Sequence, residues 1–220
     1  MGGAPVVGVT RPAGRFLPLP DLARYGMLPL LHDLADERVL VAGGGAVAAR
    51  KARFFGAEAD VVVLARTFRS GADFGTAARV RVALDPPALP TWLARVDPAV
   101  VVAATDDADL NGALATAARE AGALVNRADE AGRRDPGSVA LPATAREGDV
   151  VVGVGTGGQS PALAAHLRDR IEARVDDLAE AEAMASLTAD LRADLAARDL
   201  PAADRHAAIR AVVGSREVWT

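Results

Sequence analysis

The 220-residue chain contains no cysteine, which excludes disulfide bridges, thiol catalysis and thiolate metal sites. Aromatic residues make up only 4% of a chain that is 50% hydrophobic, so we expect close packing of small side chains. No apolar run approaches the roughly 20 residues that a membrane-spanning helix needs, and we expect a soluble, cytoplasmic protein. The net charge of -4 gives no electrostatic reason to bind nucleic acid.

Histidine and lysine are also scarce. Lys51 is the only lysine, so arginine carries nearly all of the positive charge. The three histidines, His32, His166 and His206, show no ligand spacing such as H-x-x-x-H, and we therefore predict no preformed metal site.

A three-glycine turn follows an apolar run at 38–42 and precedes an alanine-rich segment expected to be helical over 46–57. Strand, glycine turn and helix, in that order, are what binding of a dinucleotide pyrophosphate requires. Gly43 suits the tight turn, Gly45 lets the backbone approach the phosphates, and Ala48 keeps helix and strand close. A glycine turn can also serve only to reverse a chain, but the strand and helix around it favour the dinucleotide interpretation.

Strand and helix patterns alternate from about residue 38 to residue 126, which predicts an α/β fold with a Rossmann-like parallel sheet. Further strands are expected at 59–65, 80–83, 99–104 and 122–126, with helices at 90–95 and 108–121. The pattern then changes, with extended segments expected at 138–143 and 150–154. From Pro161 to about residue 212 the chain is predicted to be helical, with a break at 198–201.

Polar residues follow two of the predicted strands. Arg66 and Thr67 follow the second strand, where a dehydrogenase that prefers NAD often has an acid for the ribose hydroxyls. Arg66 could meet a 2′-phosphate or lie over the adenine, so NAD and NADP both stay open. Thr105 and Asp106 follow the fourth strand, at the sheet edge where α/β folds bind ligands. Asp107 could line the same edge or be the N-cap of the next helix.

Asp129 lies just beyond the fifth strand. A carboxylate there could exchange a proton beside a nicotinamide, or it could be an ordinary turn aspartate. Arginines surround it in the sequence and could clamp a polyanionic substrate or form a solvated surface: Arg127, Arg133, Arg134 and Arg146. The glycines at 153–158 could cradle an anion or only allow a sharp turn before the helix capped by Ser160.

Four motifs follow one another along the chain at spacings typical of a known family: GGGAVAARKA at 43–52, ATDDADLN at 104–111, NRAD at 126–129 and TGGQSPALAAHLRDRIE at 156–172. Together they resemble the precorrin-2 dehydrogenase family, which also forms the amino-terminal part of bifunctional siroheme synthases. The resemblance covers about Met27 to Ile209. It implies a Rossmann-like domain, a middle segment that exchanges strands across a homodimer, and a helical carboxyl-terminal domain. We therefore expect a loose extension at 1–26, an NAD-binding domain at 27–126, a dimerisation segment at 127–158 and a helical domain at 159–220.

The resemblance implies NAD-dependent oxidation of precorrin-2 to sirohydrochlorin and, in some members, insertion of ferrous iron. Asp129 matches the family's functional aspartate, three positions after an asparagine. The cofactor contacts implied are Gly43, Gly45, Ala46, Val47, Arg66, Thr67, Thr105 and Asp106. The residues expected to bind the substrate carboxylates are Arg127, Arg133, Arg134, Arg146 and Ser138.

Two departures from the family pattern bear on iron insertion rather than on oxidation. Val139 follows Ser138 where many members have phenylalanine, and Glu147 separates Arg146 from Gly148 where many have Arg-Gly. The alternative function is a non-catalytic module that senses NAD(H), which would not need Asp129 within an arginine cluster. A dehydrogenase for a small hydroxy acid is disfavoured because no histidine is expected near the cleft.

Overall fold

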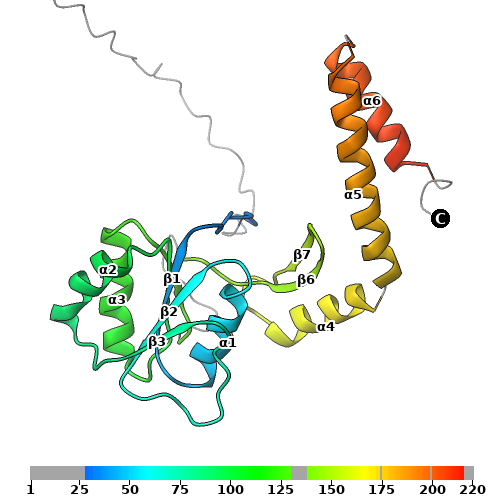
Figure 1. Cartoon of the computed structure of the whole chain (residues 1–220). Coiled ribbons are helices and arrows are strands. Elements are labelled where there is room, and N and C mark those ends of the chain that lie inside the picture. The colour runs from blue at the N-terminus through cyan, green and yellow to red at the C-terminus, as the bar shows by residue number, and fades with distance from the viewer. Residues whose placement is uncertain (1–27, 130–137, 174, 199, 216–220) are drawn as a thin grey trace, which may run out of the picture.

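The computed structural model describes residues 28–129, 138–173, 175–198 and 200–215. The expected loose extension at 1–26 and the predicted substrate residues Arg133 and Arg134 lie outside the described residues. A parallel sheet with helices on both faces is followed by a hairpin and three further helices (Figure 1).

The main sheet has five parallel strands in the order β3-β2-β1-β4-β5. They are β1 (Arg38–Ala42), β2 (Asp60–Ala65), β3 (Ala78–Arg81), β4 (Val100–Ala103) and β5 (Leu124–Arg127). Strand β1 is central, and Val39 lies opposite both Val61 and Val100. The chain moves outward from β1 to β3 and then crosses to β4 on the other side. The carboxyl ends of β1 and β4 are thus the switch point where such sheets bind ligands.

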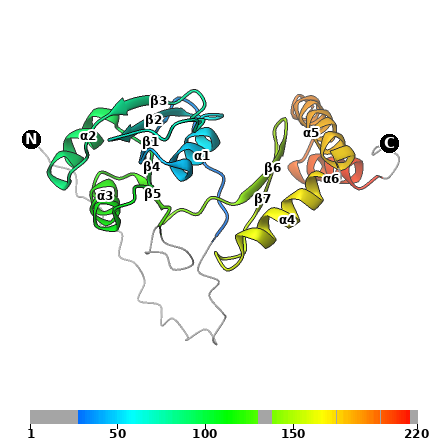
Figure 2. The ribbon, with the colours of Figure 1, turned by 90° about the horizontal axis from the view of Figure 1, so that it is seen from below.

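Side chains of the central strands alternate between two hydrophobic clusters because successive residues of a strand point to opposite faces. Val39 and Val41 pack against α1 (Ala46–Phe55), whose Ala48 and Ala52 are fully buried. On the other face, Leu40 packs with α2 (Leu89–Val96), which follows a short 3-10 turn at Pro86–Ala88, and with α3 (Ala108–Glu120) (Figure 2). The α/β fold is therefore confirmed, as is the close packing of small side chains.

The hairpin after the sheet is made of β6 (Ala143–Glu147) and β7 (Val150–Val154), which pair antiparallel. The extended segment expected at 138–143 is therefore misplaced. Only an isolated parallel bridge joins Ser138 to Val125, and β6 begins at Ala143 after Pro142, which has no N–H to donate. Gly148 has a φ of +50° in the turn, a conformation that favours glycine and lets the polar segment before it pair with β7.

The helical region comprises α4 (Pro161–Glu172), α5 (Val175–Ala196) and α6 (Ala202–Val213). The predicted helical character and the break near Pro201 are confirmed, whereas the end of α4 at Glu172 was not predicted. Helix α4 lies along the hairpin, whereas α5 and α6 pack on each other away from the five-stranded sheet (Figures 1 and 2). On α4, Leu163 is 48% and Leu167 38% exposed, so these two leucines, four residues apart on one face of the helix, are not buried within one chain. No helix in the described ranges is long and apolar enough to cross a membrane.

Candidate active site

The glycine turn is held tightly between two other segments. Gly43 has a φ of +129°, and a Cβ there would lie 2.2 Å from the carbonyl oxygen of Ala104. A Cβ on Gly44 would lie 1.9 Å from the carbonyl oxygen of Thr67. Backbone hydrogen bonds, from Gly43 to Leu64 at 2.9 Å and from Arg69 to Gly44 at 2.8 Å, fix the turn. The tight turn predicted at Gly43 is confirmed, and Gly44 proves equally constrained.

Gly45, in contrast, faces open space. It is the N-cap of α1 with a φ of -87°, it offers no side-chain cap, and a Cβ there would meet nothing within 4 Å. Ala46 and Val47 are exposed, and the first turn of α1 contains no acid. The first N–H groups of α1 and its helix dipole are therefore available to an anion. These residues fit the pyrophosphate of a dinucleotide.

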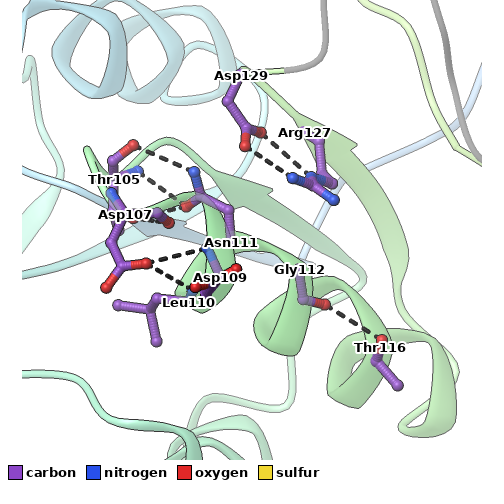
Figure 3. A network of polar contacts seen from close by, with 9 residues as sticks. All are labelled: Thr105, Asp107, Asp109, Leu110, Asn111, Gly112, Thr116, Arg127 and Asp129. Atoms are coloured by element: carbon purple, nitrogen blue, oxygen red, sulfur yellow. Dashed lines mark hydrogen bonds and ion pairs between the residues drawn. The ribbon is translucent and has the colours of Figure 1, made fainter.

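A buried asparagine joins the end of β4 to α3 (Figure 3). Asn111 is 0% exposed, and its Oδ1 accepts hydrogen bonds from the N–H of Thr105 at 3.1 Å and from its Oγ1 at 2.7 Å. Its Nδ2 donates to the carbonyl of Thr105 at 3.1 Å. The predicted site did not include Asn111. In the sequence, Asn111 could have been recognised as a single uncharged polar residue within the otherwise apolar face of the predicted helix.

Asp107 caps α3. Its Oδ1 accepts hydrogen bonds from the N–H groups of Asp109 and Leu110, each at 3.0 Å, so the N-cap interpretation is confirmed. Asp106, the residue expected to line the cofactor site, is exposed just before this cap.

Asp129 and Arg127 form a bidentate ion pair at the carboxyl end of β5 (Figure 3). Arg127 donates from Nε to Oδ1 at 3.2 Å and from Nη2 to Oδ2 at 2.7 Å, and the Asp129 side chain is 25% exposed. The Arg127 guanidinium, helped by a hydrogen bond from Asn111, holds the pKa of Asp129 below its ordinary value, although partial burial opposes this. Asp129 is therefore a carboxylate at neutral pH, able to accept a proton but not to donate one.

Contacts link the glycine turn to this carboxylate. Gly43 packs against Thr105, because a Cβ added to Gly43 would lie 3.2 Å from the Thr105 nitrogen. Thr105 in turn hydrogen-bonds to Asn111, which helps to lower the pKa of Asp129. The phosphate-facing turn and the candidate base thus belong to one connected edge of the sheet.

The remaining predicted residues lie in several places. Arg66 and Thr67 are exposed directly after β2. Arg146, on β6, pairs with Glu58 at 3.2 Å, and Glu58 precedes β2 at the opposite, amino edge of the sheet from Asp129. The hydroxyl of Ser138 accepts a hydrogen bond from Arg119 at 3.3 Å. Within one chain, the arginines that are close in sequence are therefore not all brought together.

The glycines at 153–158 form a sharp turn. Gly157 and Gly158 have φ values of +63° and +84°, and Thr156 closes the turn by donating from Oγ1 to the carbonyl of Ser160 at 3.0 Å. Ser160 then caps α4 by accepting from the N–H of Leu163 at 3.2 Å. In the part of the chain that the structure describes, no three His, Asp or Glu side chains cluster as metal ligands would.

Comparison with known proteins gives a consistent set of similarities. The pattern of a family described as "Putative NAD(P)-binding" matches residues 30–143, and that of "Sirohaem biosynthesis protein central" matches residues 152–174. The chain is 33% identical over 203 residues to a precorrin-2 dehydrogenase of Methanosarcina barkeri, covering 87% of this chain and 85% of that protein.

Siroheme synthases are similar over a smaller share of their length. The siroheme synthase of Azotobacter vinelandii is 36% identical over 148 residues, which cover 66% of this chain but only 30% of that protein. Among solved structures, SirC, a precorrin-2 dehydrogenase, superposes with a TM-score of 0.61 at 20% identity, covering 88% of this chain and 93% of the other. This likeness supports the fold.

Proposed function

Because this chain belongs to the precorrin-2 dehydrogenase family, we propose that it oxidises precorrin-2 to sirohydrochlorin with NAD as its cofactor. The observation that carries the proposal is the Asp129 carboxylate, held ionised by Arg127 at the sheet edge where Asn111 hydrogen-bonds to Thr105 beside the glycine turn. Candidate proton acceptor and dinucleotide site therefore meet at one edge of the sheet.

The reaction removes two hydrogens from precorrin-2, one as a hydride and one as a proton. NAD, when bound, supplies the hydride acceptor. Asp129 takes the proton, because its carboxylate is ionised and still partly exposed to an incoming substrate. Arg127 orients this carboxylate, and Asn111 holds the end of β4 in place. Gly45, Ala46 and Val47 receive the pyrophosphate, with Arg66, Thr67, Thr105 and Asp106 around the rest of the nucleotide.

We further propose that the substrate's carboxylates bind Ser138 and the arginines around Asp129: Arg127, Arg133, Arg134 and Arg146. Precorrin-2 carries eight carboxylates, and the planar guanidinium group pairs with a carboxylate through two parallel hydrogen bonds. Arg146 lies on the β6–β7 hairpin and pairs with Glu58 at the amino edge of the five-stranded sheet, opposite Asp129. It would therefore serve the site of a partner subunit more readily than the site of its own chain.

We also propose a homodimer, with 27–126 as the NAD-binding domain, 127–158 as the dimerisation segment and 159–220 as the helical domain. The exposed Leu163 and Leu167 on α4, and the position of α5 and α6 away from the sheet, support contacts with a second copy. Sedimentation equilibrium should give twice the mass of the chain; a monomer at micromolar concentration would contradict this arrangement.

Replacing Arg127 by glutamine should shift the acid limb of the kcat/KM profile to higher pH. The guanidinium lowers the pKa of Asp129, so the carboxylate of the native enzyme is protonated only below the usual range of an aspartate. Without the cation, protonation begins at a higher pH and removes the proton acceptor earlier. Rates measured from pH 4 to 8 at saturating NAD test this. An unchanged acid limb would show that Asp129 does not control it.

The function itself is tested by anaerobic incubation with precorrin-2 and NAD. NADH formation together with the spectrum of sirohydrochlorin would establish the dehydrogenase. Ferrous iron is added next, because in iron insertion the Asp129 carboxylate could also take the pyrrole N–H protons; a further spectral shift would establish this second activity. Measurable NAD binding without NADH formation would instead favour the NAD(H)-sensing module.

A further inference from the structure

A cavity of about 460 Å³ lies between α1 and the loop that follows β2. Its lining includes Ala46, Arg50 and Arg53 from α1, and Arg69, Ser70 and Asp73 from the loop. Positions 46, 50 and 53 are separated by four and three residues, so they share one face of the helix. The small side chain of Ala46 leaves the cavity open toward the start of α1.

The cavity is positively charged. Arg53 is already paired with Asp73, the Nε–Oδ2 distance being 3.5 Å, and this pair is largely exposed. Neither Arg50 nor Arg69 forms an ion pair with any residue that the structure describes, and both are exposed. The guanidinium groups of Arg50 and Arg69 are therefore left to bind an anion, because Asp73, the carboxylate that lines the cavity, is paired with Arg53.

The position of the cavity connects it with the nucleotide. Ala46 directly follows Gly45, and Arg69 donates its N–H to the carbonyl of Gly44 at 2.8 Å, so the cavity adjoins the glycine turn. It lies on the β2 side of α1, and in dinucleotide-binding folds the 2′-hydroxyl of the adenosine ribose is bound near the end of β2.

The end of β2 lacks the acid that would select against a 2′-phosphate. The strand ends at Ala65, and the next residues are Arg66 and Thr67, both exposed. An acid at this point bonds the ribose hydroxyls of NAD and repels the extra phosphate of NADP, whereas an arginine nearby accommodates that phosphate. The positive charge of the cavity and its position beside the end of β2 thus both favour a 2′-phosphate.

We propose that this cavity receives the 2′-phosphate of NADP, with Arg50 and Arg69 as its partners, so that the chain accepts NADP as well as NAD. The use of NADP in turnover rests on the proposed dehydrogenase function. Binding of the phosphate does not, so it is tested without the tetrapyrrole substrate.

Calorimetric titration of the full chain with adenosine 2′,5′-bisphosphate and with adenosine 5′-monophosphate separates the contribution of the 2′-phosphate. The bisphosphate should bind at least about tenfold more tightly, as expected for hydrogen bonds to a charged group. Arg50→Ala and Arg69→Ala should each remove most of this preference and leave the affinity for the monophosphate within about twofold. Arg170→Ala, which removes an exposed arginine of α4, is the matched control and should change neither affinity.

Three results would overturn the proposal. The wild-type chain could bind both nucleotides equally, or its preference for the bisphosphate could survive both substitutions. The two variants could also bind the bisphosphate normally but show a raised KM for precorrin-2 with NAD, which would assign the cavity to substrate carboxylates. A chain that prefers the bisphosphate through Arg50 and Arg69 yet oxidises no precorrin-2 would keep this inference and reject the proposed function.

Discussion

Asp129→Asn is expected to lower kcat for precorrin-2 oxidation by about a hundredfold or more, the range expected for loss of a general base. Asparagine has nearly the same shape and can still accept a hydrogen bond from Arg127, but its amide cannot take up the proton that leaves the substrate. The dissociation constant for NAD should stay within about twofold, because the glycine turn and the start of α1 are unchanged. Rapid-mixing kinetics with precorrin-2, together with NAD titration, measure both quantities.

Asp109→Asn is the matched control for this substitution. Asp109 is an exposed acid in the first turn of α3, close to the site in sequence, and its side chain has no role in the proposed chemistry. Its variant should retain nearly full activity. Retained activity in Asp129→Asn would contradict the assignment of the base, while equal losses in both variants would point to a general electrostatic effect.

Gly43→Ala is expected to destabilise the fold by about 4 kcal/mol, from the combined costs of a strained backbone and of overpacking. Its φ of +129° is rarely adopted by residues with a side chain, and the added Cβ would lie 2.2 Å from the backbone oxygen of Ala104. That oxygen belongs to the segment that follows the buried strand β4 and cannot move aside without disturbing the sheet. Urea unfolding followed by circular dichroism would measure the loss.

Gly45→Ala is the informative contrast. Its φ of -87° suits alanine, and the added Cβ meets nothing within 4 Å, so the free energy of unfolding should change by less than about 0.5 kcal/mol. The affinity for NAD should nevertheless fall by about tenfold, since the new methyl group would keep the pyrophosphate away from the first N–H groups of α1. Unchanged NAD affinity would show that the pyrophosphate does not bind over Gly45.

Local patterns predicted most of the five-stranded domain. The strand at 38–42 coincides with β1, and the helices expected at 46–57 and 108–121 differ from α1 and α3 by only one or two residues at their ends. These elements are marked by continuous apolar runs, a glycine turn and an N-cap, all of which are short-range features. The strand β6 was missed because ATARE is polar, and its pairing with β7 depends on a partner strand rather than on its own composition.

Sequence proximity was a poor guide to the arginines. Arg127 was expected to bind substrate, and the structure instead pairs it with Asp129, two residues away, because both side chains leave the end of β5 toward the same side. The ion pair does not exclude substrate binding by Arg127, but it shows that Arg127 keeps the Asp129 carboxylate ionised. Arg146 is only 17 positions beyond Asp129, yet the hairpin carries it to the opposite edge of the sheet.

The sequence by itself determined the α/β fold, the glycine turn and the family, because these depend on residue types at short, regular spacings. Only the tertiary structure decided that Asp129 is held as a carboxylate, that Asn111 is buried against the end of β4, and that Arg50 and Arg69 share a cavity beside the glycine turn. Each of these depends on distances between side chains from separate elements. Such distances are set by how β-strands and helices pack, which no local pattern specifies.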